Sequence, residues 1–469
     1  MLNFERAANR NMAQQFEALA RIIGSEKVST EKTSLIAYSK DATPLFEGMP
    51  DVIISPTSTS DVVAIVKFAN ENKIPLIARG AGSNLAAATV PLNGGIVMSM
   101  NGMNKILEVS KAELIARVQP GVTNLELDTE VGKEGLRFVP DPGSRNVSTI
   151  GGNVATSAGG LRGLKYGTTM NYVLGLEAVL GTGEVIRTGG RLVKNVAGYD
   201  LTRLLVGSEG TLAIFTEITL ALSPRPTVSK YGVAYFDDLA NASVAVEKVI
   251  TSGIVPSTLE FLDNKCVVAV EEFAHLGLDT NAGALLLFGD DGVGPIVGET
   301  VIAMSELIKS VTGCRAVTLA KNVVEAEALL YARRCSLPAL ARHGTVTILE
   351  DISVPRPAMA EVVNLINQIA QKFNLEIGVF GHAGDGNLHP TIVLDKDDGE
   401  ALKRAENALA EIFALPKKFN GTITGEHGIG SAKLPYLRDQ IGEVGIQLQR
   451  DLKRVFDPNG ILNPNRLGS

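Results

Sequence analysis

The chain has 469 residues, of which 45% are hydrophobic and 20% charged, and its formal net charge is −7. This length predicts two or three domains, and the composition is that of a folded globular protein rather than a disordered one. The acidic balance gives no reason to expect nucleic acid or an anionic membrane surface as a partner. The sequence has no run of about 18 apolar residues, so no transmembrane segment is expected, and residues 1–6 do not start like a secretory signal.

Three isolated cysteines, Cys266, Cys314 and Cys335, form neither a disulfide framework nor the closely spaced set that holds an iron–sulfur cluster. We therefore expect a cytoplasmic protein that carries no iron–sulfur cluster of its own.

The first part of the chain alternates short strands with helices. A short amphipathic helix comes first, with an apolar face expected to contain Phe16, Leu19, Ile22 and Ile23. Strands are expected at residues 50–58, 75–79 and 95–100, with a capped helix after the first of them. Residues 106–109 and 114–118 predict a β-hairpin.

Two prolines within residues 222–226 interrupt regular structure and mark the predicted domain boundary. Beyond it, strands at 228–236 and 284–289 and a helix at 244–251 predict a second α+β segment. The last fifty residues carry reactive side chains that must meet whatever the first domain binds. The predicted division is therefore 1–222, 223–417 and a C-terminal segment, 418–469, that packs back onto the first domain.

Three glycine-rich segments of the first domain favour close approach of the backbone to an anion: 79–84, 148–153 and 158–160. Without a Cβ atom, glycine lets backbone N–H groups converge on phosphate oxygens. Gly80 and Gly82 lack the third glycine of a Rossmann fingerprint, and no Gly-Lys-Ser/Thr phosphate loop is present. Any one segment could be a tight structural turn, but the three together favour a phosphate cradle.

Three of the five histidines lie in two glycine-rich stretches, residues 381–389 and 425–430. The first stretch places His382 and His389 seven residues apart around a turn, with strands expected at 376–380 and 388–394. The second contributes Glu426 and His427. Two imidazoles and a carboxylate form a three-ligand site with open positions, which is how catalytic divalent metals are held. The alternative is a pair of surface hairpins with incidental histidines.

Five segments resemble the FAD domain of the vanillyl-alcohol oxidase / p-cresol methylhydroxylase superfamily: 79–84, 140–143, 149–155, 194–201 and 207–212. The two histidine-containing stretches resemble its D-2-hydroxyacid dehydrogenase branch, which includes the glycolate oxidase flavin subunit, FAD-dependent D-lactate dehydrogenases and D-2-hydroxyglutarate dehydrogenase. The resemblance covers residues 40–469. It implies an α+β fold in which a two-part FAD-binding domain is joined to an α+β substrate, or cap, domain.

The resemblance implies FAD as the cofactor. The residues it assigns to FAD are Arg79, Gly80, Ala81, Gly82, Ser83, Asn84, Pro142, Gly143, Thr149, Gly152, Asn153, Ser157, Gly159, Gly160, Glu209, Gly210 and Ile214. Relatives with covalent flavin place a His or Cys on these loops, whereas Ser83 and Asn84 fill the first loop here. We therefore expect non-covalent FAD. The run 86–88 is Ala-Ala-Ala where relatives often have Ser-Gly-Gly, which is a departure from the pattern.

The resemblance also assigns chemistry at the flavin. His382, His389 and Glu426 would bind a divalent metal (Zn, Fe or Mn), and His427 would be the catalytic base. Asn387 would hydrogen-bond the substrate or the flavin edge.

The resemblance assigns Arg334 to the substrate carboxylate; the alternative is that Arg333 and Arg334 form a solvated helix face. The apolar stretches 336–339 and 348–349 favour a small monocarboxylate. No motif surrounds His275 or His343, which we expect to be structural or exposed.

The predicted function is metal-assisted, FAD-dependent oxidation of a small D-2-hydroxy acid such as D-lactate or glycolate. Electrons are expected to pass to an iron–sulfur subunit or an electron-transfer flavoprotein, with oxygen as the alternative acceptor. Rival functions are a flavin relay subunit without its own substrate, a dehydrogenase for D-2-hydroxyglutarate, and an alkylglycerone-phosphate synthase or enolpyruvyl reductase on the same FAD domain. An alkylglycerone-phosphate synthase or an enolpyruvyl reductase would not need the His382, His389 and Glu426 set.

Overall fold

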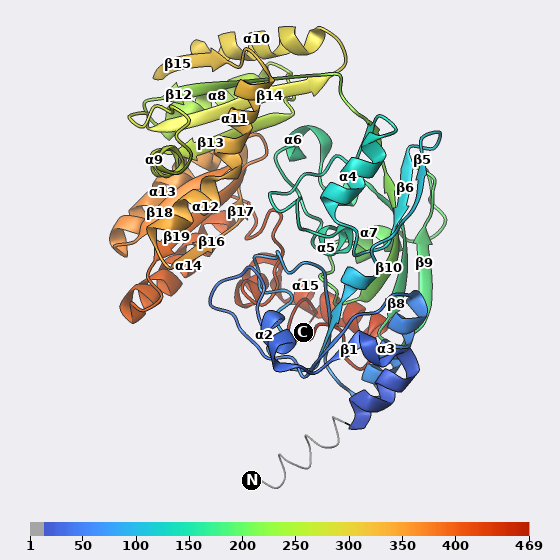
Figure 1. Cartoon of the computed structure of the whole chain (residues 1–469). Helices are drawn as coiled ribbons and strands as arrows, with labels where there is room; N and C mark the ends of the chain where they lie inside the picture. Colours follow the sequence, from blue (N-terminus) through green and yellow to red (C-terminus); the bar gives the residue numbers. More distant parts are fainter. Residues whose placement is uncertain (1–13, 469) are drawn as a thin grey trace.

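The computed structural model describes residues 14–468, and these residues form two small sheets, one large sheet and a separate two-stranded pair. Figure 1 shows the large sheet and its helices on one side of the molecule, the two small sheets on the other, and the C-terminal residues between them. The predicted α+β class is confirmed. Within the described residues, no helix is both long enough and apolar enough to span a membrane.

The first small sheet has the strand order β1, β2, β4, β3. Its strands are Val28–Ser29, Val52–Ile54, Ile96–Ser99 and Leu76–Arg79, in that order. The helix α3 (Thr59–Asn72) covers this sheet and buries Val62, Ile65, Val66 and Ala69. The Ser58 hydroxyl accepts a hydrogen bond from the Asp61 N–H and caps α3, whereas the sequence left the cap open between Ser58 and Ser60. The short helix α2 (Lys32–Ala37) precedes β2.

One predicted core residue is wrong. Phe16, Leu19 and Ile23 are buried in the helix at 14–23, but the Ile22 side chain is 70% exposed. At about 100° per residue, Ile22 points roughly 90° away from the centre of the face formed by the other three.

The second small sheet is antiparallel, with the strand order β5, β6, β10, β8, β9. Its strands are Ile106–Ser110, Ile115–Val118, Ala213–Ala221, Val173–Leu180 and Val185–Gly189. The predicted hairpin is β5 and β6. Around this sheet lie α4 (Asn124–Gly132), α5 (Ile150–Thr156), α6 (Gly163–Tyr166), α7 (Leu201–Leu205) and the two-stranded pair β7 (Leu136–Arg137) and β11 (Ser223–Pro224).

The large sheet has the strand order β15, β12, β14, β13, β18, β19, β16, with β17 also paired to β19. Its strands are Cys314–Leu319, Val228–Phe236, Ala284–Gly292, Thr258–Asp263, Glu376–His382, Asn387–Leu394, Val346–Leu349 and Ile352–Ser353. Hydrogen bonds pair the two histidine-bearing strands, β18 and β19, as an antiparallel hairpin. This confirms the strands expected on either side of the first histidine stretch.

Helices cover both faces of the large sheet. One core contains α8 (Leu239–Thr251), α10 (Ile296–Lys309) and α13 (Met359–Lys372), on which α14 (Gly399–Lys418) packs. A second core contains α9 (Asn264–Ala274), α11 (Val323–Arg334) and α12 (Ser336–Leu340). The predicted helix at 244–251 begins earlier, at Leu239, because the Asp238 side chain caps it by accepting from the Asn241 N–H.

The C-terminal segment connects the large sheet to the small ones. Its helix α15 (Leu434–Phe456) places Leu437 in the core of the large sheet and Phe456 in that of the second small sheet. The helix is kinked at Gly442, whose φ is 71°. Leu462 then forms a parallel bridge with Leu76 of the first small sheet. The C-terminal segment therefore packs against all three sheets, while the division at residues 222 and 417 stays a prediction.

The buried ammonium of Lys453 fastens this segment to the second small sheet. Its Nζ donates to the Asp457 carboxylate at 2.5 Å, to the Thr211 carbonyl at 2.6 Å and to the Leu462 carbonyl at 2.6 Å. The Lys453 residue is only 7% exposed.

We expect Lys453→Met to destabilise the protein by about 3–5 kcal/mol, because it leaves a buried carboxylate and two buried carbonyls without their donor. The apparent midpoint of thermal unfolding should fall clearly. Arg454→Met on the same helix is the control, since the Arg454 side chain is 68% exposed and, among the described residues, forms an ion pair only with Asp451. Equal effects of the two substitutions would contradict the role given to Lys453.

Candidate functional site

A cavity of about 580 Å³ lies between the small sheets and the large sheet. Its lining includes every residue predicted to contact the cofactor except Ser157. Ser157 ends α5 with a φ of 52°, and its hydroxyl lies 3.2 Å from the Thr168 hydroxyl. The large sheet and its helices add Arg333, Arg334, His382 and His389 to the same cavity, and the C-terminal segment adds Glu426 and His427.

At three glycines on the cofactor side, an added Cβ atom would overlap a neighbouring side chain. A Cβ atom at Gly80 would overlap the Thr149 hydroxyl, and one at Gly159 would overlap the Glu426 carboxylate. Gly82 has a φ of 71°, which favours glycine, and a Cβ there would overlap the Arg79 guanidinium.

Polar atoms in the cavity wall lack partners. Asp141 Oδ1, Ser148 Oγ and Asn153 Nδ2 are buried and accept or donate no hydrogen bond within the described residues. Buried polar atoms in folded proteins are nearly always paired. A glycine-lined wall with unpaired donors and acceptors fits a polar cofactor such as a dinucleotide.

The three predicted metal ligands converge. One ligand atom from each of His382, His389 and Glu426 lies within 4.8 Å of the others. Glu426 Oε1 is 3.2 Å from His382 Nε2 and 3.5 Å from His389 Nε2. All three residues line the cavity, and both histidines are buried. The set has the ligand types and the open side that a catalytic metal requires.

The Nδ1 atoms of the two imidazoles, which point away from Glu426, already have hydrogen-bond partners. His389 Nδ1 lies 3.3 Å from the Glu350 carbonyl, which can only accept, so this nitrogen carries the proton and Nε2 keeps its lone pair. His382 Nδ1 lies 2.8 Å from Glu260 Oε1 and is oriented in the same way. Partners of this kind fix the tautomer of metal-binding histidines.

Electrostatics also favours a cation between these groups. Burial alone would lower the pKa of His382, but Glu260 and Glu426 on its two sides raise it well above the usual value. Burial alone would raise the pKa of Glu426, but its contacts with His382 and His389 hold it well below the ordinary range. Either a proton on His382 or a divalent ion beside it satisfies the two carboxylates.

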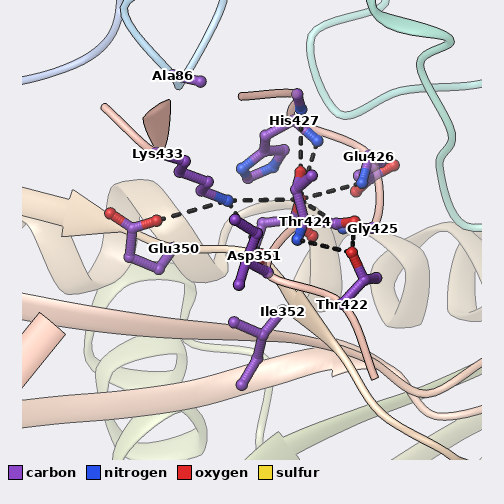
Figure 2. A network of polar contacts seen from close by, with 12 residues as sticks. Ala86, Glu350, Asp351, Ile352, Thr422, Thr424, Gly425, Glu426, His427 and Lys433 are labelled. Carbon is purple, nitrogen blue, oxygen red and sulfur yellow. Dashed lines mark hydrogen bonds and ion pairs between the residues drawn. The ribbon is translucent and has the colours of Figure 1, made fainter. Parts of the chain in front are cut away.

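His427 is placed to exchange a proton in the cavity. Its ring stacks on that of His389, with the centroids 5.2 Å apart, and its Nδ1 is buried with no hydrogen-bond partner within residues 14–468. Burial lowers the pKa of His427 to about 4, an effect that the Asp351 charge only partly offsets. The imidazole is therefore neutral near pH 7 and able to accept a proton. Figure 2 shows His427 directly after Glu426 on the turn.

Of the two arginines on α11, Arg333 is the buried one. It is 7% exposed, donates from Nε to Glu260 Oε2 at 2.8 Å, and lies over the Phe380 ring at 4.7 Å. The Arg334 side chain is 35% exposed and lies 3.9 Å from the Glu327 carboxylate. Both line the cavity, so the alternative of a solvated helix face does not describe Arg333.

Asn387 lies outside the cavity lining. Its amide nitrogen donates to Asp351 Oδ1 at 2.5 Å and to the Ile352 carbonyl at 3.0 Å. The structure therefore does not bring Asn387 to the position expected for a substrate contact. Of the two remaining histidines, His275 ends α9 with a φ of 52°, and His343 lies between Glu272 and Glu376.

The sequence motifs did not identify Glu260 or Asp351. Both are acidic residues inside apolar runs, at 258–262 and 346–352, and both are almost fully buried. A carboxylate in such a run indicates a paired buried charge and could have been noticed.

In contrast, the 194–201 motif lies outside the cavity lining, and its Val196 and Tyr199 side chains are 97% and 96% exposed.

Two family models match the chain. One is described as the FAD binding domain and matches residues 50–189; the other is described as FAD linked oxidases, C-terminal domain, and matches residues 225–467. The second model alone covers more than half of the chain.

Curated relatives match over almost the whole length. The chain is 45% identical to the glycolate oxidase subunit GlcD of Bacillus subtilis, covering 96% of each chain. It is 34% identical to the D-lactate dehydrogenase of Anaerostipes hadrus, covering 97% of each.

Solved structures share the fold. A p-cresol methylhydroxylase structure superimposes with a TM-score of 0.81 at 18% identity, covering 97% of this chain and 96% of that one. An alkyldihydroxyacetonephosphate synthase superimposes with a TM-score of 0.76 at 21% identity, covering 97% and 86%. At these identities the likeness extends to the fold alone.

We expect Glu260→Gln to weaken binding of a divalent metal by about 10–100-fold, because the amide no longer holds the His382 Nδ1–H with a negative charge. Metal content after dialysis against a buffered series of free Zn²⁺ or Mn²⁺ measures this. Glu327→Gln, an exposed carboxylate beside Arg334, is the control. Unchanged affinity in Glu260→Gln would mean that His382 is oriented without Glu260.

Proposed function

The chain belongs to the FAD-linked oxidases of the glycolate oxidase and D-lactate dehydrogenase type, and on this basis we propose that it oxidises a small D-2-hydroxy acid to the 2-oxo acid. The proposed substrates are D-lactate and glycolate. The observation that carries the proposal is that His382, His389, Glu426 and His427 face the same cavity as the glycine-lined wall.

FAD is the proposed cofactor, and when bound it supplies the acceptor for the hydride that leaves the substrate Cα. The 79–84 loop and the 148–153 segment would hold its phosphates through backbone N–H groups. We propose non-covalent binding, because the first loop carries Ser83 and Asn84 rather than His or Cys.

His427 would take the proton of the substrate hydroxyl as the Cα–H bond breaks. Its low pKa keeps the imidazole in the accepting form at neutral pH. A divalent ion held by His382, His389 and Glu426 would lower the pKa of the hydroxyl and make this transfer easier. Zn, Fe or Mn would suit a set of two imidazoles and one carboxylate.

The substrate carboxylate would be bound by the arginines of α11. We give Arg333 the main part, because its planar fork is buried in the cavity and oriented by Glu260. Arg334 would assist from the more exposed side. Leu337, Pro338 and Leu349 complete this part of the wall. Their apolar surface supports a small monocarboxylate over a dicarboxylate such as D-2-hydroxyglutarate.

An iron–sulfur subunit or an electron-transfer flavoprotein is the proposed electron acceptor. The Bacillus subtilis relative is named as a subunit of glycolate oxidase, which supports an assembly with other chains. The three cysteines lie far apart in the sequence and are free in the described residues, which does not suggest an iron–sulfur cluster within this chain.

Anaerobic mixing with D-lactate or glycolate should bleach the flavin absorbance of the protein, whereas D-2-hydroxyglutarate and L-lactate should act much more slowly. His427→Ala should slow this reduction by about 10²–10⁴-fold, the usual contribution of a general base, and leave bound FAD unchanged. Acid denaturation should release FAD into the supernatant. Failure of the whole panel to reduce the flavin would contradict the proposed activity, and flavin that remains with the precipitate would contradict non-covalent binding.

Arg333→Lys should lower kcat/KM by about 10–100-fold, since a charged hydrogen bond contributes roughly 1.5–3 kcal/mol. Arg334→Lys should have a much smaller effect. Steady-state kinetics with D-lactate and an artificial dye compares the matched pair. A larger loss of kcat/KM in Arg334→Lys than in Arg333→Lys would mean that Arg334 is the main ligand of the substrate carboxylate.

A further inference from the structure

The turn that carries Glu426 and His427 has no helix or strand of its own. Residues 425–429 are irregular and Gly428 has a φ of 88°. The backbone N–H groups of such a segment need partners, and its side chains keep a fixed direction only if something outside holds the turn.

Asp351 supplies those partners. This residue follows β16, precedes β17 and is 0% exposed. Its Oδ2 accepts hydrogen bonds from the backbone N–H groups of Gly425 at 2.9 Å, Glu426 at 3.0 Å and His427 at 2.9 Å. The Thr424 hydroxyl donates to the same oxygen at 2.6 Å. Figure 2 shows the turn wrapped around this carboxylate.

The buried negative charge of Asp351 is compensated from the opposite side. Lys433 is 0% exposed, and its Nζ lies 3.7 Å from Asp351 Oδ2 and 3.6 Å from Glu350 Oε2. It also donates to the Asp351 carbonyl at 3.0 Å. Asn387 donates to Asp351 Oδ1, the oxygen that does not face the turn. Asp351 is therefore itself held in place by a cation and an amide.

A second carboxylate holds the rest of the turn. Glu209, from the segment before β10, accepts from the N–H groups of Ile429 and Gly430, both at 2.7 Å. Asp351 thus holds the half of the turn that bears the reactive side chains, and Glu209 holds the half that follows.

We propose that Asp351 is a positioning residue, whose carboxylate fixes the backbone at 425–427 and so aims the Glu426 carboxylate and the His427 imidazole into the cavity. This inference rests on the proposed function for the roles of Glu426 and His427. The hydrogen bonds by which Asp351 holds the backbone do not depend on that function. A carboxylate suits this task because a single charged oxygen can accept from several converging N–H groups. An amide in its place would turn either a neutral oxygen or an N–H₂ group toward four donors.

The test compares Asp351→Asn with Glu350→Gln in the full-length protein loaded with FAD. Both substitutions replace a buried carboxyl group near Lys433 with an amide, but within residues 14–468 no hydrogen bond or ion pair joins the Glu350 side chain to the turn. Hydrogen–deuterium exchange, read on the peptide that covers 424–430, measures the hold on the backbone without any substrate. Metal content and the kcat and KM for D-lactate measure its consequence.

In Asp351→Asn, we expect exchange in this peptide to become at least about 10-fold faster while distant peptides and FAD content stay unchanged. Metal content should fall, and kcat should fall by about 10-fold or more with a smaller change in KM. Glu350→Gln should match the unmodified protein in the exchange of this peptide. Unchanged exchange in Asp351→Asn, or equal acceleration in both variants, would overturn the proposal.

Thr424→Val is the second variant if Asp351→Asn does not fold. It removes one donor to Asp351 Oδ2 and also the acceptor of the Gly428 N–H, so a smaller acceleration confined to the same peptide is expected. Unchanged exchange there would likewise overturn the proposal. If no hydroxy acid reduces the flavin of the unmodified protein, the proposed function fails, yet the exchange measurement still decides the role of Asp351.

Discussion

The site depends on the pairing of buried carboxylates. Glu260 and Glu426 contact His382, one of the proposed metal ligands, and Asp351 accepts from the N–H of His427 beside them. A buried charge without a partner is costly. The adjacent residues Glu350 and Asp351 illustrate how pairing decides the pKa of a buried carboxyl group. Burial raises the pKa of Glu350 to about 7, and the neighbouring Asp351 charge adds to this rise, which Lys433 offsets only in part. Asp351 is equally buried, but its electrostatic interactions with His427, Lys433 and His389 hold its pKa far below the usual range.

The same pairing joins the parts of the molecule. Glu260 contacts both Arg333 on α11 and His382 on β18, so the proposed carboxylate-binding arginine and the proposed metal ligand share one partner. Glu209 belongs to the cofactor side of the cavity, but both of its carboxylate oxygens accept hydrogen bonds from the turn at 429–430. The C-terminal segment can therefore present Glu426 and His427 to the cavity only when the small sheets and the large sheet are assembled around it.

The sequence predicted what depends on local pattern. The histidine hairpin, the capped helix α3 and the glycine-rich segments follow from spacing and turn chemistry. The structure brings the hairpin histidines and the glycine-rich segments to one cavity. Arg333 and Arg334 could not be separated in this way, because adjacent positions on a helix differ only in direction, and direction is decided by the packing of α11. Asn387 was given a substrate contact because it lies beside His389 in the motif. Its partners are Ile352, the first residue of β17, and Asp351 just before it, which lie 35 and 36 residues earlier and are brought to Asn387 by the tertiary fold.

The fold itself does not determine the reaction. The chain superimposes on p-cresol methylhydroxylase at 18% identity, and at that identity the likeness shows a shared fold and not a shared reaction. The proposed chemistry comes from side chains that the second half of the chain adds to one wall: two imidazoles from a hairpin, a carboxylate and a third imidazole from the 425–430 turn, and a guanidinium from α11. The hairpin positions its imidazoles through strand pairing, whereas the turn has no pairing of its own. A site built partly on an irregular turn needs an external acceptor for the N–H groups of that turn, and a buried carboxylate opposite the cavity meets this need without blocking the face where substrate would bind.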